Sequence, residues 1–356
     1  KPRPTENNDF RPIALTSIVM KCLERIVLRN LIGPIRSSID PLQFAYQPQR
    51  CANDAVLSFV HTLQEHLDTP RRYARALFVD FSSAFNTIQP HRLIEKLLHL
   101  KVKPSLILWI TDFLLTRSQR VRVNNILSEP LHTNTGSPQG CVLSPIIFIL
   151  YTNDCLSHFN NVHTFKYADD TAILGLIKYD EKDYRDCVDN FNSWCVENYL
   201  ELNVQKTKEI LFDFRIKVES KPSDHPVSIK GQDIEIVTSY KYLGTNIDNE
   251  LVWNGHTKAL ATKGSQRMHF LRKLRSYHVD RTILSLFYRS VVESIMTYDS
   301  VVWYNSARKK DQGKLKTIVK QAAKIINRPM DFDEVCRNSS VYGCQGVKGF
   351  KSPPEW

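Results

Sequence analysis

Two adjacent carboxylates, Asp169 and Asp170, interrupt an otherwise mostly apolar stretch and restrict how the residues around them can fold. Aromatic residues precede them (Phe165 and Tyr167), and aliphatic residues follow over 172–174. The pattern predicts two strands of a tight hairpin with the acids at its turn, where Asp is a favoured residue. Two acids held together raise each other's pKa unless a cation lies between them. Taken alone, the stretch fits either a solvated turn or a site for a divalent metal.

A third acid, Asp80, has a matching position at the end of another apolar run. Residues 76–79 are continuously apolar, which is typical of a strand buried on both faces, and they lie within a predicted strand over Tyr73–Phe81. A carboxylate at the end of a buried strand is costly unless it has a partner. By itself Asp80 is more typical of a turn or a helix cap, but beside the acidic pair it indicates a shared metal site.

Composition favours a polyanionic partner. The 356 residues are enough for two or three domains, and 48 basic against 37 acidic residues give 48 − 37 = +11. With a pI near 9.2, nucleic acid is the commonest partner for such a chain. No apolar run approaches the roughly 18 residues of a membrane span. The first residue is Lys1 and no signal-peptide layout follows, so we expect a soluble piece of a longer reading frame.

The eight cysteines are scattered without CxxC pairs, which favours reduced thiols in an intracellular protein over a zinc module. A truncated zinc knuckle that uses Cys336 and Cys344 remains the alternative for the end of the chain.

Helical spacing and turn signals divide the first 250 residues into short elements. A loop with glycines at 136 and 140 around Ser-Pro-Gln lets backbone approach a ligand closely, although an ordinary loop before a core helix is the alternative. We expect Ser144 to be the N-cap of that helix, with Pro145 at its first position. The other predicted elements are helices at 17–31, 54–67, from Pro90, 105–115 and 180–199, a strand at Gln119–Asn124, and a strand pair within 237–247.

From residue 255 the apolar period becomes helical, with predicted helices at about 256–276, 281–304 and 309–327. These helices are rich in Lys and Arg, so we expect a separate basic bundle and a domain boundary near 248–255. The chain from Asp331 onward is expected to be unstructured.

Five short motifs occur in the order of the palm blocks of reverse transcriptases: Phe78–Asn86, Ser137–Gly140, Tyr167–Asp170, Leu202–Thr207 and Tyr242–Gly244. Together with residues 8–13, they make the chain resemble the reverse transcriptases of non-LTR (LINE-type) retrotransposons. The resemblance implies an α+β right-hand polymerase fold, with fingers and palm over 1–250, an antiparallel sheet flanked by helices, a helical thumb over 251–330 and a tail over 331–356. It also implies RNA-directed DNA polymerase activity.

Nucleotide addition requires a deprotonated primer hydroxyl to attack a highly charged triphosphate, and two Mg²⁺ ions, or Mn²⁺ as substitutes, suit that task. The expected metal and catalytic groups are Asp80, Asp169, Asp170 and the carbonyl of Phe81. By resemblance, Phe85 stacks under the sugar and excludes a 2′-hydroxyl, and Lys206 faces the pyrophosphate. The remaining expected contacts are Arg11, Gln139 and Gly140 for the nucleotide, and Tyr167, Leu243, Gly244, Lys258, Lys263 and Arg267 for primer and template.

The resemblance implies an RNA template, a DNA primer and dNTPs as partners, no membrane, and a ribonucleoprotein found in the nucleus and cytoplasm. Two alternatives from other classes remain. A retrotransposon fragment without catalysis can persist as a nucleic-acid-binding protein, and the same acids can serve a metal-dependent nuclease or phosphatase. Phe85, Lys206 and Arg11 also have ordinary interpretations, the first as a core aromatic and the others as solvated charges.

Overall fold

A five-stranded sheet forms the centre of the computed structural model, which describes residues 13–123, 125–215 and 225–343. The strand order is β13-β10-β1-β8-β7, and every neighbouring pair is antiparallel except β10 and β13. The bounds are β1 Tyr73–Val79, β7 Val162–Tyr167, β8 Asp170–Ile177, β10 Lys208–Phe212 and β13 Glu235–Ile236.

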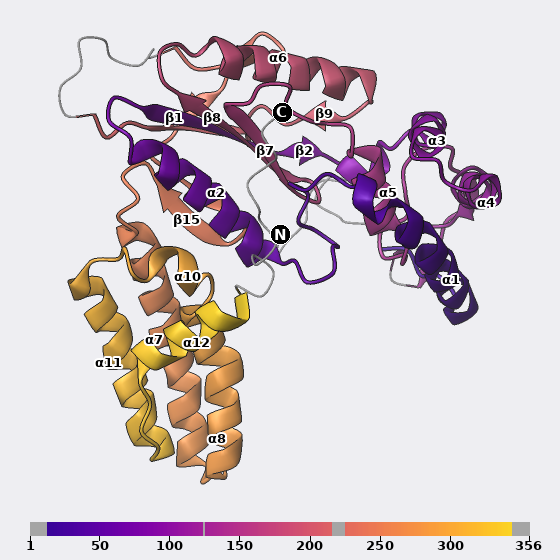
Figure 1. Cartoon of the computed structure of the whole chain (residues 1–356). Coiled ribbons are helices and arrows are strands. Elements are labelled where there is room, and N and C mark those ends of the chain that lie inside the picture. The colour runs from indigo at the N-terminus through magenta and orange to yellow at the C-terminus, as the bar shows by residue number, and fades with distance from the viewer. Residues whose placement is uncertain (1–12, 124, 216–224, 344–356) are drawn as a thin grey trace.

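Side chains alternate across this sheet, as the period of two in a strand requires. In β1, Ala74, Ala76 and Phe78 belong to one apolar cluster, while Leu77 and Val79 belong to another. Helix α2 (Ala52–Leu67) covers the first face and α6 (Lys182–Glu197) the second, as Figure 1 shows. The expected antiparallel sheet flanked by helices is therefore present.

Most of the remaining elements before residue 250 extend from the second face toward α1, where the fingers are expected, whereas β15 (Thr245–Asp248) lies on the α2 side of the sheet (Figure 1). The remaining elements are α1 Ile18–Ile35, α3 Pro90–His99, α4 Pro104–Leu115, α5 Ser144–Tyr151, β2 Phe81–Ser82, β3 Ser118–Gln119, β4 Arg122–Val123, β5 Ile126–Leu127, β6 Leu131–His132, β9 Glu201–Leu202, β11 Ser228–Ile229, β12 Gln232–Asp233, β14 Ser239–Tyr242 and β15 Thr245–Asp248, with 3₁₀ turns at Arg36–Ser38 and Ala84–Asn86.

Two of the expected boundaries differ. Helix α1 continues past Gly33-Pro34, because Ile35 is buried together with Leu31 and packing keeps the last turn helical. The strand expected at Gln119–Asn124 is instead two short strands, β3 and β4, and Asn124 lies outside the described residues.

Residues 254–343 form a set of packed helices, which we call the helical bundle. The helix expected over 281–304 is broken, because Tyr298 and Asp299 leave the helical path to contact the β14–β15 hairpin. The elements are α7 Asn254–Ser276, α8 Arg281–Phe287, a π-helical segment Tyr288–Glu293, α9 Ser294–Met296, α10 Ser300–Trp303, α11 Lys309–Ile326 and α12 Phe332–Gly343.

The end of the chain corrects one expectation. Residues 332–343 form helix α12 rather than an unstructured tail, because Phe332 and Cys336 are buried against the bundle. Residues 344–356, which include Cys344, lie outside the described residues. In the part of the chain that the structure describes, no helix is both long and apolar enough to cross a membrane.

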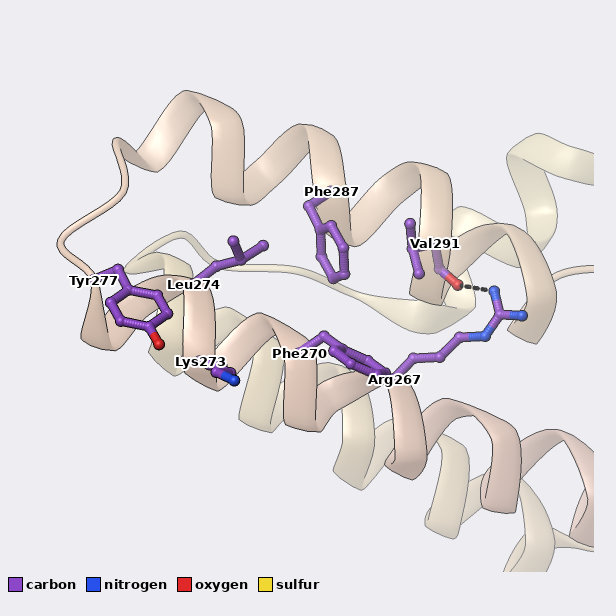
Figure 2. Close-up of a pocket in the computed structure, with 7 residues that line it drawn as sticks. All are labelled: Arg267, Phe270, Lys273, Leu274, Tyr277, Phe287 and Val291. Carbon is purple, nitrogen blue, oxygen red and sulfur yellow. Dashed lines mark hydrogen bonds between the residues drawn. The ribbon is translucent and has the colours of Figure 1, made fainter.

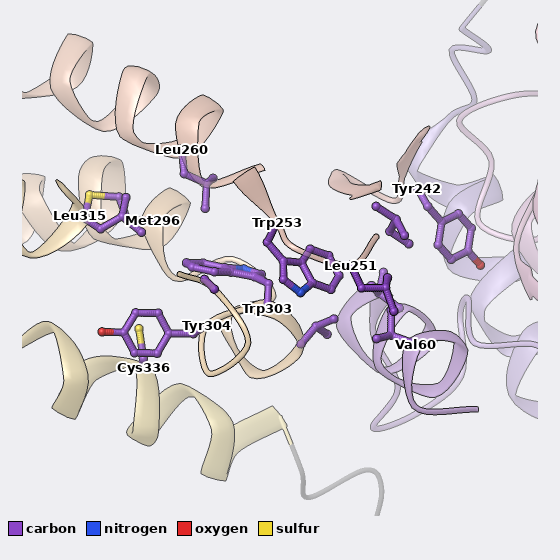
Figure 3. Close-up of a cluster of buried hydrophobic side chains, with 14 of the residues drawn as sticks. Val60, Tyr242, Leu251, Trp253, Leu260, Met296, Trp303, Tyr304, Leu315 and Cys336 are labelled. Atoms are coloured by element: carbon purple, nitrogen blue, oxygen red, sulfur yellow. The ribbon is translucent and has the colours of Figure 1, made fainter. Parts of the chain in front are cut away.

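The helical bundle shares its core with the central sheet. One buried cluster runs from Val60 and Tyr242 through Trp253 to Trp303 and Leu315 (Figure 3). Trp253 is fully buried at the start of α7 and has a left-handed backbone (φ 62°). The boundary expected near 248–255 therefore crosses a continuous core, and the bundle is not a separate unit.

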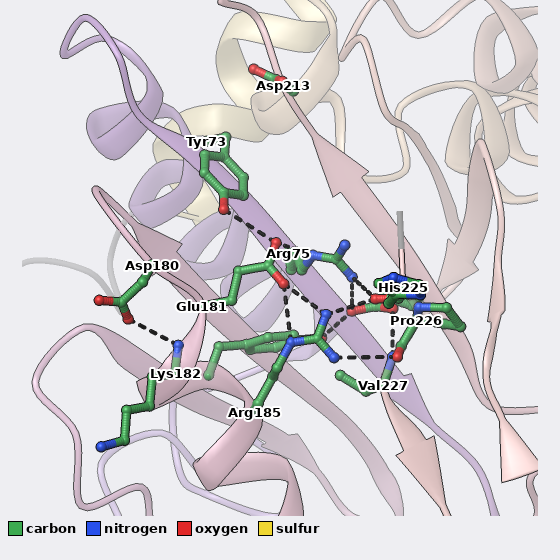
Figure 4. Close-up of polar contacts among 12 residues, drawn as sticks. Tyr73, Arg75, Asp180, Glu181, Lys182, Arg185, Asp213, His225, Pro226 and Val227 are labelled. Atoms are coloured by element: carbon green, nitrogen blue, oxygen red, sulfur yellow. Dashed lines mark hydrogen bonds and ion pairs between the residues drawn. The ribbon is translucent and has the colours of Figure 1, made fainter. Parts of the chain in front are cut away.

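A buried ionic network joins the α6 face of the sheet to α6 (Figure 4). Arg75, which has no exposed surface, donates to Glu181 at 2.9 Å and to Glu209 at 3.0 Å. Tyr184 also donates to Glu209 at 2.8 Å, and Arg185 donates to Glu181 at 2.7 Å. Since each buried charge has partners of opposite sign, the network fixes β1, β10 and α6 relative to one another.

Candidate active site

Strand register brings the three predicted acids to one end of the sheet. Val79, at the end of β1, pairs with Thr171 of β8, so Asp80 and Asp170 are the next residues on two neighbouring antiparallel strands. The hairpin of β7 and β8 closes through the pair Tyr167 and Asp170, which leaves a two-residue turn that contains Asp169. The predicted hairpin is confirmed, with Asp170 as the first residue of β8 rather than part of the turn.

The acids influence one another electrostatically. Burial, then the charge of Asp169 and then that of Asp80 raise the pKa of Asp170 to about 6. The Oδ2 atom of Asp80 accepts no hydrogen bond, and its cation neighbour is the Nζ atom of Lys206 at 3.5 Å. Because burial and the neighbouring negative charges raise the pKa of Asp170, a bound cation is favoured at this position.

The oxygen atoms of these acids suit a metal that brings further ligands with it. In the described part of the chain, no group of three or more His, Cys, Asp or Glu side chains is arranged to hold a metal ion by itself. Mg²⁺ commonly binds through one or two carboxylates and completes its shell with water and substrate phosphates. The hard oxygen donors, including the Asp80 Oδ2 atom that accepts no hydrogen bond, fit that kind of site.

The turn that carries Asp169 is supported by a segment that the sequence did not point to. Gln43 is 1% exposed, and its Oε1 atom accepts hydrogen bonds from the backbone N–H of Ala45 (3.0 Å) and of Ala168 (3.3 Å). Ala168 has a left-handed backbone (φ 56°), which is uncommon for a residue with a side chain. The buried ion pair of Lys166 and Asp40 at 2.8 Å holds the same segment against β7.

The loop over Gly136–Gly140 packs on the residues around Phe85. The N–H of Ser137 donates to the Phe85 carbonyl at 2.8 Å, and Gln139 donates to Asn86 at 3.3 Å. A Cβ atom on Gly136 would lie 2.6 Å from the carbonyl oxygen of Asn86, and its φ is +71°, so only glycine fits. Phe85 is half-buried against Phe148, with 4.8 Å between ring centroids. The structure thus brings Gln139 to Asn86, the residue next to Phe85, whereas Gly140 lies against Ile13 and Ala14.

The start of α5 is held in a way that differs from expectation. Ser144 is the first helical residue rather than the N-cap, and its hydroxyl accepts from Ser137 at 2.8 Å. Glu24, fully buried on α1, instead accepts hydrogen bonds from the N–H groups of Val142 (2.6 Å) and Leu143 (3.0 Å). A lone Glu in an apolar helical pattern gave no sequence signal of this role.

Lys206 lies on a loop that makes two hydrogen bonds with the backbone of Asp80. The N–H of Asn203 donates to the Asp80 carbonyl at 2.9 Å, and the Asp80 N–H donates to the Thr207 hydroxyl at 3.3 Å. The Lys206 side chain is 70% exposed, so it is free to turn toward a ligand. Phe81 pairs with Leu202 of β9 beside this loop.

The predicted primer and template residues are only partly brought together. Leu243 and Gly244 form the tight β14–β15 turn, where Tyr298 of the helical bundle donates to the Leu243 carbonyl at 2.6 Å. On α7, Lys258 and Lys263 are exposed, but five residues place them about 140° apart around the helix.

The three cations expected to contact primer and template therefore do not lie on one side of α7. Arg267 is half-buried and donates to the Val291 carbonyl at 2.8 Å. Arg11 lies outside the described residues.

Comparison with known proteins agrees with this geometry. A family model described as "Reverse transcriptase (RNA-dependent DNA polymerase)" matches residues 1–247, and one described as "Alkylated DNA repair protein alkB homolog 8, N-terminal" matches residues 253–294. The "Probable RNA-directed DNA polymerase from transposon BS" of Drosophila melanogaster is 28% identical over 91% of this chain and 37% of its own length. The "RNA-directed DNA polymerase from mobile element jockey" of the same species is 28% identical over 71% of this chain and 28% of its own length. The chain thus spans about a third of the length of these curated relatives.

Among solved structures, apo telomerase from Candida tropicalis has a TM-score of 0.46 at 14% identity, covering 92% of this chain and 58% of that chain. The RNA-dependent RNA polymerase of bacteriophage phi12 has a TM-score of 0.34 at 11% identity, covering 90% of this chain and 49% of that chain. At these scores the two likenesses add nothing to the assignment. Because the family match covers most of the chain, the protein belongs to the reverse transcriptase family, on its non-LTR (LINE-type) branch, with the right-hand polymerase fold.

Proposed function

We propose that this chain is an RNA-directed DNA polymerase, part of a retrotransposon-derived protein, that extends a primer 3′-hydroxyl with dNTPs on an RNA template. One observation carries the proposal: in a chain of this family, Asp80 and Asp170 end up beside each other on β1 and β8, next to the turn that contains Asp169. The relatives are named RNA-directed DNA polymerases, which supports it. Since the chain spans only part of their length, the activity of any longer protein is included in this proposal.

Two Mg²⁺ ions, or Mn²⁺ as a substitute, are the proposed cofactors. Asp80, Asp169 and the Phe81 carbonyl would hold them, with Asp170 beside the primer end. When bound, such ions lower the pKa of the primer hydroxyl and neutralise the leaving pyrophosphate. The raised pKa of Asp170 supports this assignment, because nearby positive charge would favour its ionised form.

The neighbouring side chains are assigned to the substrate. Phe85, fixed by Phe148, would lie under the sugar of the nucleotide and leave no room for a 2′-hydroxyl. Gln139 and Gly140 would line the same pocket, and Arg11 would contact the triphosphate. The exposed Lys206 would turn from Asp80 toward the pyrophosphate and donate a proton or stabilise its charge.

RNA template and DNA primer are the proposed macromolecular partners. Tyr167, Leu243 and Gly244 would contact the primer near the acids, and Lys258, Lys263 and Arg267 would contact the duplex from the helical bundle. We also propose that the protein works as a ribonucleoprotein in the nucleus and cytoplasm, on the strength of the family assignment.

Extension of oligo(dT) on poly(rA) tests the proposed activity. Purified wild type should add dTMP in the presence of Mg²⁺, and Asp169→Asn should reduce the rate by a factor on the order of 100–1000. Asp189→Asn makes the same chemical change on the exposed surface of α6 and should be as active as wild type. A wild type that binds the primer–template but adds no nucleotide with either Mg²⁺ or Mn²⁺ would refute the polymerase proposal and favour the binding-only alternative.

The same assay tests the sugar gate. Phe85→Ala should increase incorporation of ribonucleotides relative to deoxynucleotides, because the 2′-hydroxyl gains room, while DNA synthesis persists. Phe113→Ala is the matched control, since Phe113 is also a half-buried ring stacked on another aromatic, Trp109, at 5.4 Å. Equal ribonucleotide discrimination by wild type and Phe85→Ala would remove Phe85 from the gate.

A further inference from the structure

The helical bundle carries an apolar groove that the proposed chemistry does not use (Figure 2). Leu274 of α7 lies opposite Phe287 and Val291 of the helix that follows, and the space between the two helices is about 530 Å³. At one end Arg267 spans the gap and donates to the Val291 carbonyl at 2.8 Å. The groove is thus closed at that end by a fixed guanidinium.

The rim of the groove is an aromatic–cation–aromatic series. Phe270, Lys273 and Tyr277 follow one another along the same side of α7, and Phe270 and Tyr277 are two helical turns, or about 10 Å, apart. Both rings are mostly solvent-exposed, at 56% for Phe270 and 67% for Tyr277. Large exposed aromatic rings beside an apolar groove indicate a binding surface.

The charge around the groove indicates which class of ligand it could bind. Residues 251–330 contain 16 Lys or Arg and 4 Asp or Glu, so the net charge there is 16 − 4 = +12, and the rest of the chain is 11 − 12 = −1. The described residues that line the groove include two cations and no acid. An apolar groove with this surrounding field attracts a polyanion that also has flat apolar faces.

We propose that this groove binds single-stranded nucleic acid, with bases stacked on Phe270 and Tyr277 and a phosphate on Lys273. Stacking on aromatic rings together with cations along the backbone is how proteins bind single strands without reading sequence. The inference extends the proposed function, because the occupant would be the unpaired template RNA or an unpaired DNA strand. It differs from the duplex contact assigned to Lys258 and Lys263, which lie nearer the start of α7, while Arg267, assigned to the same contact, closes the end of the groove.

The test measures fluorescence anisotropy of labelled 12-nucleotide oligo(rA) and oligo(dA) without metal or dNTPs. Phe270→Ala and Tyr277→Ala should each weaken binding by about 5- to 150-fold, the range for one stacked base, with an unchanged salt dependence. Lys273→Gln should instead flatten the slope of log affinity against log salt by about 0.7. Tighter binding of RNA assigns the groove to the template, tighter binding of DNA assigns it to a DNA strand, and equal binding assigns it to both.

Two controls separate stacking from other causes. Tyr277→Phe keeps the ring and should bind like wild type. Tyr179→Ala removes another exposed tyrosine that lies beside a lysine, at 4.8 Å from the Lys178 Nζ atom, but outside the groove, and it should have no effect. Unchanged affinity in both groove alanine variants would overturn the proposal and leave the groove for a protein partner. Because no metal or nucleotide is present, failed primer extension would refute the polymerase activity without changing this result.

Discussion

Charged side chains have opposite surroundings in the network behind the central sheet and in the helical bundle. Between the sheet and α6, charges are buried and paired: Arg75 has no exposed surface and lies between Glu181 and Glu209. In the bundle, Lys258 and Lys263 are exposed, and residues 251–330 carry a net charge of 16 − 4 = +12. A buried charge has few alternative partners, so it fixes geometry, whereas an exposed charge exchanges water and ions freely and mainly governs the attraction of a polyanion.

This contrast suggests that the sheet and the bundle have different roles. In the proposed mechanism Asp80 and Asp170 would keep a fixed separation, and the network behind β1 and β10 holds the strands that carry or support them. In the same proposal the bundle would bind nucleic acid of any sequence, for which many exposed cations suffice. Substitutions on the two sides should therefore affect different measurements.

The largest expected effect on stability comes from Arg75→Met. This change removes the cation that contacts the buried Glu209 and leaves Glu181 with Arg185, and breaking a buried pair in this way typically costs about 3–5 kcal/mol. The free energy of unfolding, measured by urea denaturation, should fall by that order. Primer extension should fall with it, because β1 leads directly into Asp80.

The matched control is Arg92→Met, which removes an exposed pair with Glu95 on α3. Such surface pairs contribute about 0–1 kcal/mol, so this variant should unfold nearly like wild type. Equal losses in the two variants would show that burial does not distinguish the charges near the sheet from surface charges.

Part of this arrangement could be predicted from the sequence. The continuous apolar run before Asp80 and the acidic hairpin are local patterns, and both predict strands that end in acids. The glycine at 136 and the Tyr242–Gly244 turn were also visible, because turn chemistry is carried by the residues themselves.

The rest depends on contacts between residues far apart in the chain. Glu24 and Gln43 belong to ordinary-looking segments, and only folding brings them to Leu143 and Ala168. The shared core could not be predicted either. A change from strand to helix period suggested a boundary near 250, whereas Trp253 is buried against residues from both sides. Removal of the bundle would expose that core, so point substitutions are the better test.

An intermediate effect on stability is expected for Glu24→Ala. The buried N–H groups of Val142 and Leu143 would lose their acceptor, which costs about 1–3 kcal/mol. Because these residues follow the Gly136–Gly140 loop, the KM for dNTP should rise more than the KM for primer–template. Steady-state kinetics and urea denaturation measure the two effects.

Glu24→Gln keeps a side-chain oxygen that can accept from the same N–H groups, so it should recover part of both losses. Glu95→Ala, on the exposed surface of α3, should change neither quantity. A Gln variant as impaired as the Ala variant would show that the negative charge, rather than the hydrogen bonds, is what Glu24 contributes.

The smallest effect on stability is expected for the double variant Lys258→Gln/Lys263→Gln. Both side chains are exposed, so the free energy of unfolding should stay within about 0.5 kcal/mol of wild type. Affinity for a primer–template duplex should nevertheless fall, and the slope of log affinity against log salt should flatten by roughly 0.9 for each lost phosphate contact.

Lys178→Gln/Lys182→Gln removes two exposed cations near the start of α6 and should leave the slope unchanged. Since Lys258 and Lys263 lie on different sides of α7, the single variants show which side meets the duplex. Identical salt slopes for wild type and the Lys258/Lys263 variant would mean that these cations are only solvated surface charges. The proposed difference between a sheet that fixes geometry and a bundle that binds nucleic acid would then not hold for α7.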